Sequence, residues 1–218
     1  KKEEDRKWDP KDSRDFGSLV HTLVLEPHLV DKEFAFIDLE GRNMRLKENQ
    51  KYKAMFLDMN KTKIVLTNDS KERAKICASA LMEHEFIAGL LERDGKPELS
   101  GYYIDDFYKK HLRFRPDKLI ETKEEKDIIV DIKTCRDIEE FKKEAKFKWH
   151  YDLSAFMYKD GHKFITGKES DFYFVVVESQ APHRVSCFKA GDDFLAMGRK
   201  KYAKAMANIQ IAMGARPE

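Results

Sequence analysis

Residues 113–134 have the sequence RFRPDKLIETKEEKDIIVDIKT, which contains the densest chemical pattern in the chain. Asp131 and Lys133 follow the apolar run IIV (128–130) and are two residues apart. In a β-strand this spacing places both side chains on the same face. A carboxylate and an ammonium group beside a buried strand are costly unless they pair or bind a ligand. The simpler alternative is an ion pair on a solvated edge strand.

Asp117 favours the interpretation that Asp131 and Lys133 bind a ligand. The sequence predicts strands at 119–122 and 127–134, joined by the charged turn KEEK, and this hairpin brings Asp117 beside Asp131. Two adjacent carboxylates repel each other unless a cation lies between them. Carboxylate oxygens suit Mg²⁺, and Mn²⁺ can substitute for it. Lys133 points to the same place and can hold a water or a phosphate oxygen, so the group predicts metal-assisted phosphodiester hydrolysis.

The pair Pro116-Asp117 followed by Asp131-Ile132-Lys133 resembles the PD-(D/E)XK nuclease signature, with aspartate in the D/E position. Further segments, in the same order, resemble the RecE-type phage recombination exonucleases (exonuclease VIII). They are FGSLVHTLVLEP (16–27), which is similar to the GTxxHxxxLEP helix, ELSGYY (98–103), which is similar to the ExSxYW strand, and YDLSAFMYKDG (151–161), which is similar to the helix ending AxYxDG. The resemblance covers nearly the whole chain.

The resemblance implies a role for each matching residue. The implied metal ligands are His21, Asp117, Asp131 and the carbonyl group of Ile132. The implied catalytic group consists of Asp117, Asp131, Lys133 and Glu98, with Lys133 activating the attacking water and Glu98 supporting a second metal or orienting water. Tyr151 and Ser154 are expected on the helix face that leans over the site. Many relatives have glutamine in place of Ser154, and serine has a shorter reach.

The family resemblance also implies an activity and partners. It implies a Mg²⁺-dependent 5′-to-3′ exodeoxyribonuclease that acts on the ends of linear double-stranded DNA and leaves 3′ single-stranded tails for recombination by strand annealing. It further implies a ring-shaped homo-oligomer and a phage single-strand annealing protein as partner. Residue spacing gives no information on polarity. The expected location is the cytoplasm of a bacterium, with the protein encoded by the bacterium or by a phage.

The order of predicted elements indicates an α/β fold with a mixed central sheet flanked by helices, as in a PD-(D/E)XK restriction-endonuclease-like core. The charged residues 1–15 are expected as a lead-in, and residues 16–218 as one nuclease domain. Predicted helices, with the first capped by Ser13 and the second by Asp69 or Ser70, cover 13–25, 70–93, 137–146, 149–160 and 192–213. Predicted strands cover 33–38, 98–104, 110–115, 119–122, 127–134, 171–179 and 184–189, and the polar residues 41–49 are expected to form a loop.

Composition limits the classes of protein to which this chain can belong. The chain has 218 residues with Lys+Arg 42 and Asp+Glu 40, so a net charge of +2 does not indicate a nucleic-acid binder by itself. The three cysteines are widely spaced, which argues against a zinc ribbon or a secreted disulfide framework. No apolar stretch approaches the ~20 residues of a membrane span, and the charged N-terminal residues do not resemble a signal peptide.

For several of these residues, a purely structural role is the alternative to a functional one. His21 on an apolar helix face is more often a core histidine than a ligand. Glu98 could be an exposed strand residue, and His84 is expected on a solvated helix face. Arg113 and Arg115 suit either phosphate contacts or surface ion pairs. The lysines Lys142, Lys143, Lys146 and Lys148 are equally ambiguous, although Phe147 and Trp149 among them favour base stacking.

Two other functions remain as alternatives, and a third is nearly excluded by the number of cysteines. An endonuclease on the same core would share every catalytic residue. An iron–sulfur exonuclease requires four cluster cysteines, and the chain has 3. A catalytically silent DNA-binding module would be expected to lose Asp117, Asp131 or Lys133, and all are present.

Overall fold

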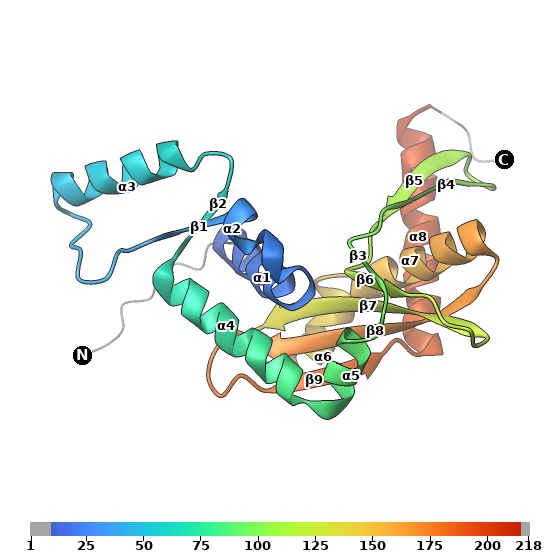
Figure 1. The fold of residues 1–218 in the computed structure, drawn as a ribbon. Coiled ribbons are helices and arrows are strands. Elements are labelled where there is room, and N and C mark those ends of the chain that lie inside the picture. The colour runs from blue at the N-terminus through green and yellow to red at the C-terminus, as the bar shows by residue number, and fades with distance from the viewer. Residues whose placement is uncertain (1–9, 215–218) are drawn as a thin grey trace.

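The computed structural model describes residues 10–214, and a mixed five-stranded sheet forms its centre (Figure 1). The helices are α1 Pro10–Leu25, the 3-10 turn η1 Pro27–Leu29, α2 Val30–Glu33, α3 Lys47–Met59, α4 Asn68–Glu83, α5 Glu85–Leu91, α6 Ile138–Phe147, α7 Tyr151–Thr166 and α8 Asp192–Ala212. The strands are β1 Phe34–Ile37, β2 Ile64–Thr67, β3 Lys96–Pro97, β4 Gly101–Asp105, β5 Lys110–Phe114, β6 Lys118–Ile120, β7 Lys126–Cys135, β8 Glu169–Glu178 and β9 Val185–Lys189.

The central sheet has the strand order β3-β6-β7-β8-β9. Strands β6 and β7 are antiparallel, whereas β7 and β8 run parallel from the pair Lys126↔Glu169 to the pair Cys135↔Glu178. Parallel neighbours require a crossover connection, which here consists of α6 and α7. The predicted mixed sheet flanked by helices is therefore confirmed.

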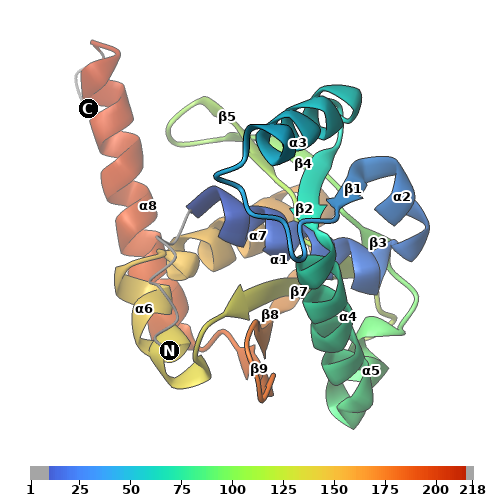
Figure 2. The ribbon, with the colours of Figure 1, turned by 90° about the vertical axis from the view of Figure 1, so that its left-hand side faces the viewer.

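Each face of the sheet is covered by helices, because β7 and β8 have apolar side chains on both faces. Val130 and Val175 pack with Leu19 of α1 and Leu81 of α4 in one core cluster. The opposite face packs against α6 and α7 in a second cluster, whose buried members include Ile129, Phe141, Ala155, Phe172, Phe174 and Val176. Figure 2 shows α4 and α5 on one side of the strands and α6 and α8 on the other.

Two smaller units are attached to this core. Strands β1 and β2 pair in parallel and carry α3, which stands apart from the central layers in Figure 1. Asn49 is the only residue of α3 that is buried. Strands β4 and β5 form an antiparallel hairpin beside α7 and the C-terminal part of α8. Tyr202 of α8 donates a hydrogen bond to Asp105 at the end of β4, at 2.6 Å.

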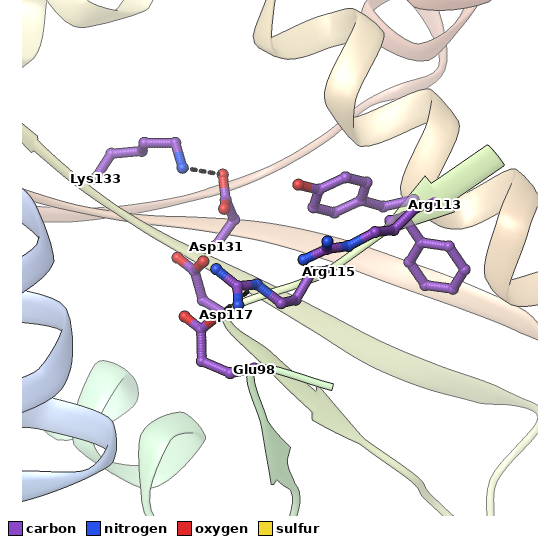
Figure 3. Close-up of a pocket in the computed structure, with 8 residues that line it drawn as sticks. Glu98, Arg113, Arg115, Asp117, Asp131 and Lys133 are labelled. Atoms are coloured by element: carbon purple, nitrogen blue, oxygen red, sulfur yellow. Dashed lines mark ion pairs between the residues drawn. The ribbon is translucent and has the colours of Figure 1, made fainter. Parts of the chain in front are cut away.

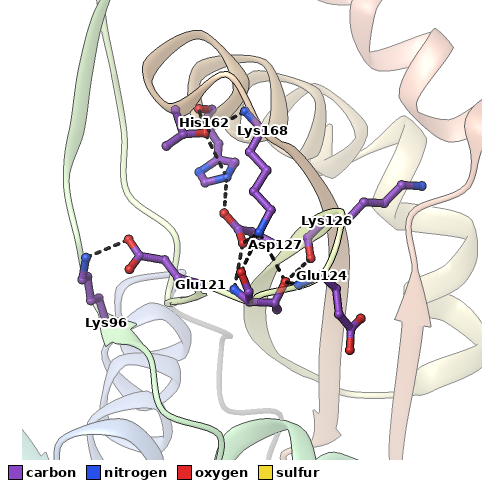
Figure 4. A network of polar contacts seen from close by, with 9 residues as sticks. Lys96, Glu121, Glu124, Lys126, Asp127, His162 and Lys168 are labelled. Carbon is purple, nitrogen blue, oxygen red and sulfur yellow. Dashed lines mark hydrogen bonds and ion pairs between the residues drawn. The ribbon is translucent and has the colours of Figure 1, made fainter.

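Buried polar contacts fix the start of β7. The carboxylate of Asp127 accepts hydrogen bonds from Lys168 Nζ at 2.6 Å and from the Thr122 amide at 2.8 Å. His162 Nε2 lies 3.1 Å from the other oxygen of Asp127. Figure 4 shows these groups converging from the β6–β7 turn, α7 and the segment before β8. This network joins the hairpin to the crossover helix.

The structure corrects three expectations. Thr67, instead of Asp69 or Ser70, caps α4, since its hydroxyl accepts a hydrogen bond from the Ser70 amide. The helix predicted for 70–93 is broken at His84, whose ring accepts from the Ile87 amide and caps α5, so His84 is not on a mid-helix face. The expected loop at 41–49 ends where α3 begins.

Helix α1 starts at Pro10, inside the expected lead-in, so Ser13 lies within the helix and is not its cap. Residues 1–9 of that lead-in lie outside the described residues. Within residues 10–214, no helix combines the length and apolar character needed to cross a bilayer.

Candidate metal centre

The β6–β7 hairpin places Asp117 beside Asp131. Asp117 directly precedes β6, and the register pairs Lys118 with Val130, which brings the next residue of β7 opposite Asp117. The carboxylate of Asp117 accepts a hydrogen bond from the Ile132 amide at 2.5 Å. The juxtaposition expected from the sequence is therefore present, because a short turn fixes the register of the two strands.

Asp131 and Lys133 leave β7 on the same side. Lys133 Nζ lies 2.6 Å from Asp131 Oδ2, and the Asp131 residue is only 5% exposed. The ring of Tyr151, the first residue of α7, lies 5.2 Å from the same ammonium. A buried carboxylate is thus held between an ammonium group and a second carboxylate, which argues against a solvated edge-strand ion pair.

His21 reaches the same place from α1. The buried Leu19 and Val20 fix this part of α1 on the core, and His21 lies next to them. His21 Nε2 lies 2.7 Å from Asp117 Oδ2, and its Nδ1 lies 3.1 Å from Glu98 Oε1. Donor atoms of His21, Glu98 and Asp117 lie within 4.8 Å of one another, the one such group of three or more among residues 10–214.

Glu98 has a strained backbone. Its φ of 50° lies in the left-handed region, which is unusual for a residue with a Cβ atom. The Glu98 amide donates to the Asp117 carbonyl at 3.0 Å, and Arg115 Nε contacts the second carboxylate oxygen at 2.8 Å. Backbone strain of this kind costs energy and is often found at functional sites.

The electrostatics show how these charges balance in the protein alone. Burial disfavours the charged form of His21, but hydrogen bonds to Asp117 and Glu98 outweigh it and raise the pKa to about 9. Burial raises the pKa of Asp131 to about 7, with Lys133 opposing this effect and Asp117 adding to it. The pKa of Asp117 is lowered despite its burial, because Lys133 and His21 stabilise the carboxylate. The pKa of Lys133 is raised, since Asp131 and Asp117 outweigh burial. The imidazolium group of His21 and the ammonium group of Lys133 thus balance negative charge on the neighbouring carboxylates, and such a carboxylate cluster attracts cations.

A pocket of about 380 Å³, here called the carboxylate pocket, adjoins these side chains, although His21 is not among the residues that line it (Figure 3). It is lined by Glu98, Arg113, Phe114, Arg115, Asp117, Asp131, Lys133 and Tyr158. Arg113 and Arg115 approach it from β5 and the residue that follows the strand. The pocket therefore has acidic side chains at its base and two guanidinium groups at its side.

The predicted residues differ in how closely they approach the pocket. Tyr151 contacts Lys133, whereas Tyr151 and Ser154 are not among the described residues that line the pocket. Tyr158 lines it instead and was not predicted, although it lies seven residues after Tyr151 and thus on the same face of α7. Phe114 was also missed, because nothing in the sequence distinguishes a pocket wall from a core aromatic. Ile132 contributes its amide to Asp117, while its carbonyl remains a predicted ligand.

Comparison with known proteins agrees with this fold. A family model described as "PDDEXK-like domain of unknown function (DUF3799)" matches residues 1–217. A crystal structure described as "Putative exonuclease" from Eubacterium rectale superposes with a TM-score of 0.63 at 12% identity, covering 97% of this chain and 71% of that one. A crystal structure described as SSO0001 has a TM-score of 0.39 at 15% identity and covers 92% and 87% of the two chains. None of the curated proteins compared matches the sequence significantly. At 12% identity the likeness to the Eubacterium rectale structure concerns the fold alone.

Proposed function

This chain belongs to the PDDEXK-like domain family, and on that premise we propose that it is a metal-dependent 5′-to-3′ exodeoxyribonuclease acting on linear double-stranded DNA. The observation that supports the proposal is the convergence of three side chains whose donor atoms could hold a metal ion, next to a buried aspartate–lysine pair. The family fold supplies the sheet on which this group is built. Fold alone does not determine activity, so the proposal depends on the residues of the site.

The donor set fits a hard divalent cation. His21, Asp117, Asp131 and the carbonyl of Ile132 would hold it, with Glu98 as a further carboxylate beside His21. Carboxylate and carbonyl oxygens favour Mg²⁺ or Mn²⁺, and one imidazole is compatible with both. When bound, such an ion acidifies a water molecule and offsets negative charge on the phosphate. Binding requires the neutral imidazole, so His21 must release a proton that it holds at neutral pH.

The protein's own side chains would then orient the reacting groups. Lys133 carries its ammonium beside Asp131, where it can hold a water molecule or a phosphate oxygen. Arg113 and Arg115 at the side of the pocket can contact backbone phosphates. The ring of Tyr151 lies against the ammonium group of Lys133 and restricts the position of that group. Preorganised cations stabilise charge that develops in the transition state.

The finer features of the proposal are supported by the resemblance to RecE-type exonucleases. We expect removal of the 5′-ended strand, which leaves 3′ tails suited to recombination by strand annealing. A ring-shaped homo-oligomer and a phage single-strand annealing protein as partner belong to the same proposal, as does a location in the cytoplasm of a bacterial cell.

Digestion of linear duplex DNA labelled separately at its two kinds of end tests the proposal. We expect Mg²⁺-dependent release of the 5′ label before the 3′ label, with no release in EDTA and partial or full activity with Mn²⁺. Lys133→Ala should lower the cleavage rate by about 10²–10³-fold, as for the loss of other charge-stabilising groups. Lys126→Ala is the matched control, because Lys126 lies at the opposite end of β7, exposed and outside the carboxylate pocket.

Three outcomes would contradict the proposal in different ways. A wild-type protein that cleaves no DNA with any divalent metal would favour a silent binding module. Nicking of closed circular DNA would favour an endonuclease. Release of the 3′ label first would leave nuclease activity intact and reverse the proposed direction.

A further inference from the structure

The β4–β5 hairpin has one face packed on the protein and one face open. Tyr103 and Phe114 are buried on the packed face, where Tyr103 contacts Phe164 and Phe114 contacts Tyr158 of α7. On the opposite face Tyr102 is 66% exposed, far more than a tyrosine held in a core. A strand alternates its side chains between two faces, so this contrast follows from the pleat.

Four side chains form the open face: Tyr102, Ile104, His111 and Arg113. The register pairs Tyr102 with Arg113 and Ile104 with His111, so these residues are direct cross-strand neighbours. The guanidinium of Arg113 lies 5.9 Å from the centre of the Tyr102 ring. None of the four carries a carboxylate, although 40 of the 218 residues in the chain are Asp or Glu. The open face therefore combines an exposed phenol ring, an aliphatic side chain, an imidazole and one guanidinium group, with no carboxylate among them.

This face is continuous with the carboxylate pocket. Arg113 belongs to both, because it is exposed on β5 and also lines the pocket. Arg115, two residues further along the chain, continues the basic row and contacts Glu98 beside His21. A polymer bound along Arg113 and Arg115 would thus be led toward Asp117 and Asp131 (Figure 3).

We propose that the open face of the β4–β5 hairpin binds single-stranded DNA adjoining the carboxylate pocket, with Tyr102 stacking on a base and Arg113 contacting a phosphate. Charge complementarity favours a nucleic acid, since Arg113 has no carboxylate beside it on the open face and Arg115, which pairs with Glu98, follows it toward the pocket. The exposed ring favours a single strand, because the bases of a duplex already stack on one another and only unpaired bases offer a free face. The inference rests on the proposed DNA substrate and adds the surface that receives the unpaired strand.

Equilibrium binding without cleavage tests this inference separately from the proposed activity. The probe is a short dye-labelled oligothymidine, measured by fluorescence anisotropy with the full chain in EDTA. Tyr102→Ala should raise the Kd by about 5- to 150-fold, the range for loss of one base stack. Tyr102→Phe keeps the ring and should restore binding. Phe86→Ala is the control, because Phe86 is also exposed (55%) and lies on α5, away from the hairpin in Figure 1.

A second variant checks the phosphate contact. Arg113→Gln should reduce the slope of log binding constant against log salt by about 0.7, as expected for one contact to a single strand. Circular dichroism and melting of each variant establish that the hairpin variants are folded.

Equal oligothymidine binding by wild type and Tyr102→Ala would overturn the inference. So would an equal loss of binding to oligothymidine and to a duplex with closed ends, since the face would then not distinguish unpaired DNA. A change in oligomeric state of Tyr102→Ala without DNA would assign the face to self-association. Wild-type protein that binds oligothymidine through Tyr102 but cleaves no DNA would refute only the proposed function.

Discussion

At the scale of single residues, Glu98 combines an unfavourable backbone conformation with a carboxylate directed at His21. At an ordinary position in a helix or strand, a glycine variant has a free energy of unfolding roughly 0.5–1 kcal/mol lower than the alanine variant. At a φ of 50° alanine retains the Cβ strain and glycine does not. We therefore expect Glu98→Gly to be at least as stable as Glu98→Ala, measured as the free energy of unfolding in urea.

The two variants should lose the same amount of metal affinity, because both remove the carboxylate. Glu169, which lies in β8, provides the control pair, and there the glycine variant should be the less stable one. If Glu98→Gly were less stable than Glu98→Ala by the usual margin, the left-handed conformation would carry no strain.

The site residues differ in how far the sequence could predict them. Asp117, Asp131 and Lys133 were recognisable because a hairpin and a two-residue spacing fix their placement. The approach of His21 to Glu98 and Asp117 was expected only from family resemblance, since α1 is distant in sequence from the hairpin. Tyr158 could have been found from its helical spacing to Tyr151. Its pocket-lining position depends on packing against Phe114, which no local pattern reveals.

At the scale of elements, the Asp127 network ties the start of β7 to α7 and β8, as Figure 4 shows. Burial opposes the charge of Asp127, but the hydrogen bond from Lys168 outweighs it and holds the pKa below the usual 3.8. A carboxylate with a lowered folded-state pKa contributes stability above the unfolded-state pKa, and this contribution is lost as pH falls through the folded-state value.

We therefore expect Asp127→Asn to lower the free energy of unfolding at pH 7 by about 1–3 kcal/mol, because Lys168, which is partly exposed, loses a charged hydrogen-bond partner. The deficit should be smaller at a pH well below 3.8, because the wild-type carboxylate becomes protonated as pH falls from the usual value through its lower folded-state pKa. Urea unfolding at both pH values measures this. Glu124→Gln, at an exposed position of the same turn, should change stability little at either pH. A deficit that does not vary with pH would contradict the assigned role of the carboxylate charge.

Sequence patterns predicted the long buried strands and missed helix α3 and the short strand β2, although Leu66 of β2 is buried in the core. Strands β7 and β8 are recognisable from their continuous apolar runs. Helix α3 was not predicted, because its side chains cover no core and so show no clear apolar stripe. The break between α4 and α5 at His84 was missed because neither glycine nor proline marks it.

At the scale of the whole molecule, stability is distributed unevenly between the central sheet and the β1–β2 unit with α3. Isolated helices shorter than about 12–15 residues are marginal in water, and α3 has 13 residues with one of them buried. Amides of α3 should therefore exchange with deuterium orders of magnitude faster than those of β7 and β8, whose exchange approaches the global unfolding limit. Helix α6, with 10 residues packed against the sheet, is the internal control and should be well protected.

Hydrogen exchange followed by mass spectrometry, at low protein concentration, makes this comparison. Protection of α3 equal to that of β8 would show that α3 is held by contacts absent from a single copy of the chain.

The distribution of donor groups along the chain has a consequence for biosynthesis. His21 lies on the first helix, whereas Asp131 lies on a strand that is translated more than a hundred residues later. A ribosome that stalls before β7 releases a polypeptide without Asp131 and Lys133, and a proteolytic fragment that begins after α1 lacks His21. If the proposed site is the active site, the protein would therefore remain inactive until most of the chain has been synthesised and assembled.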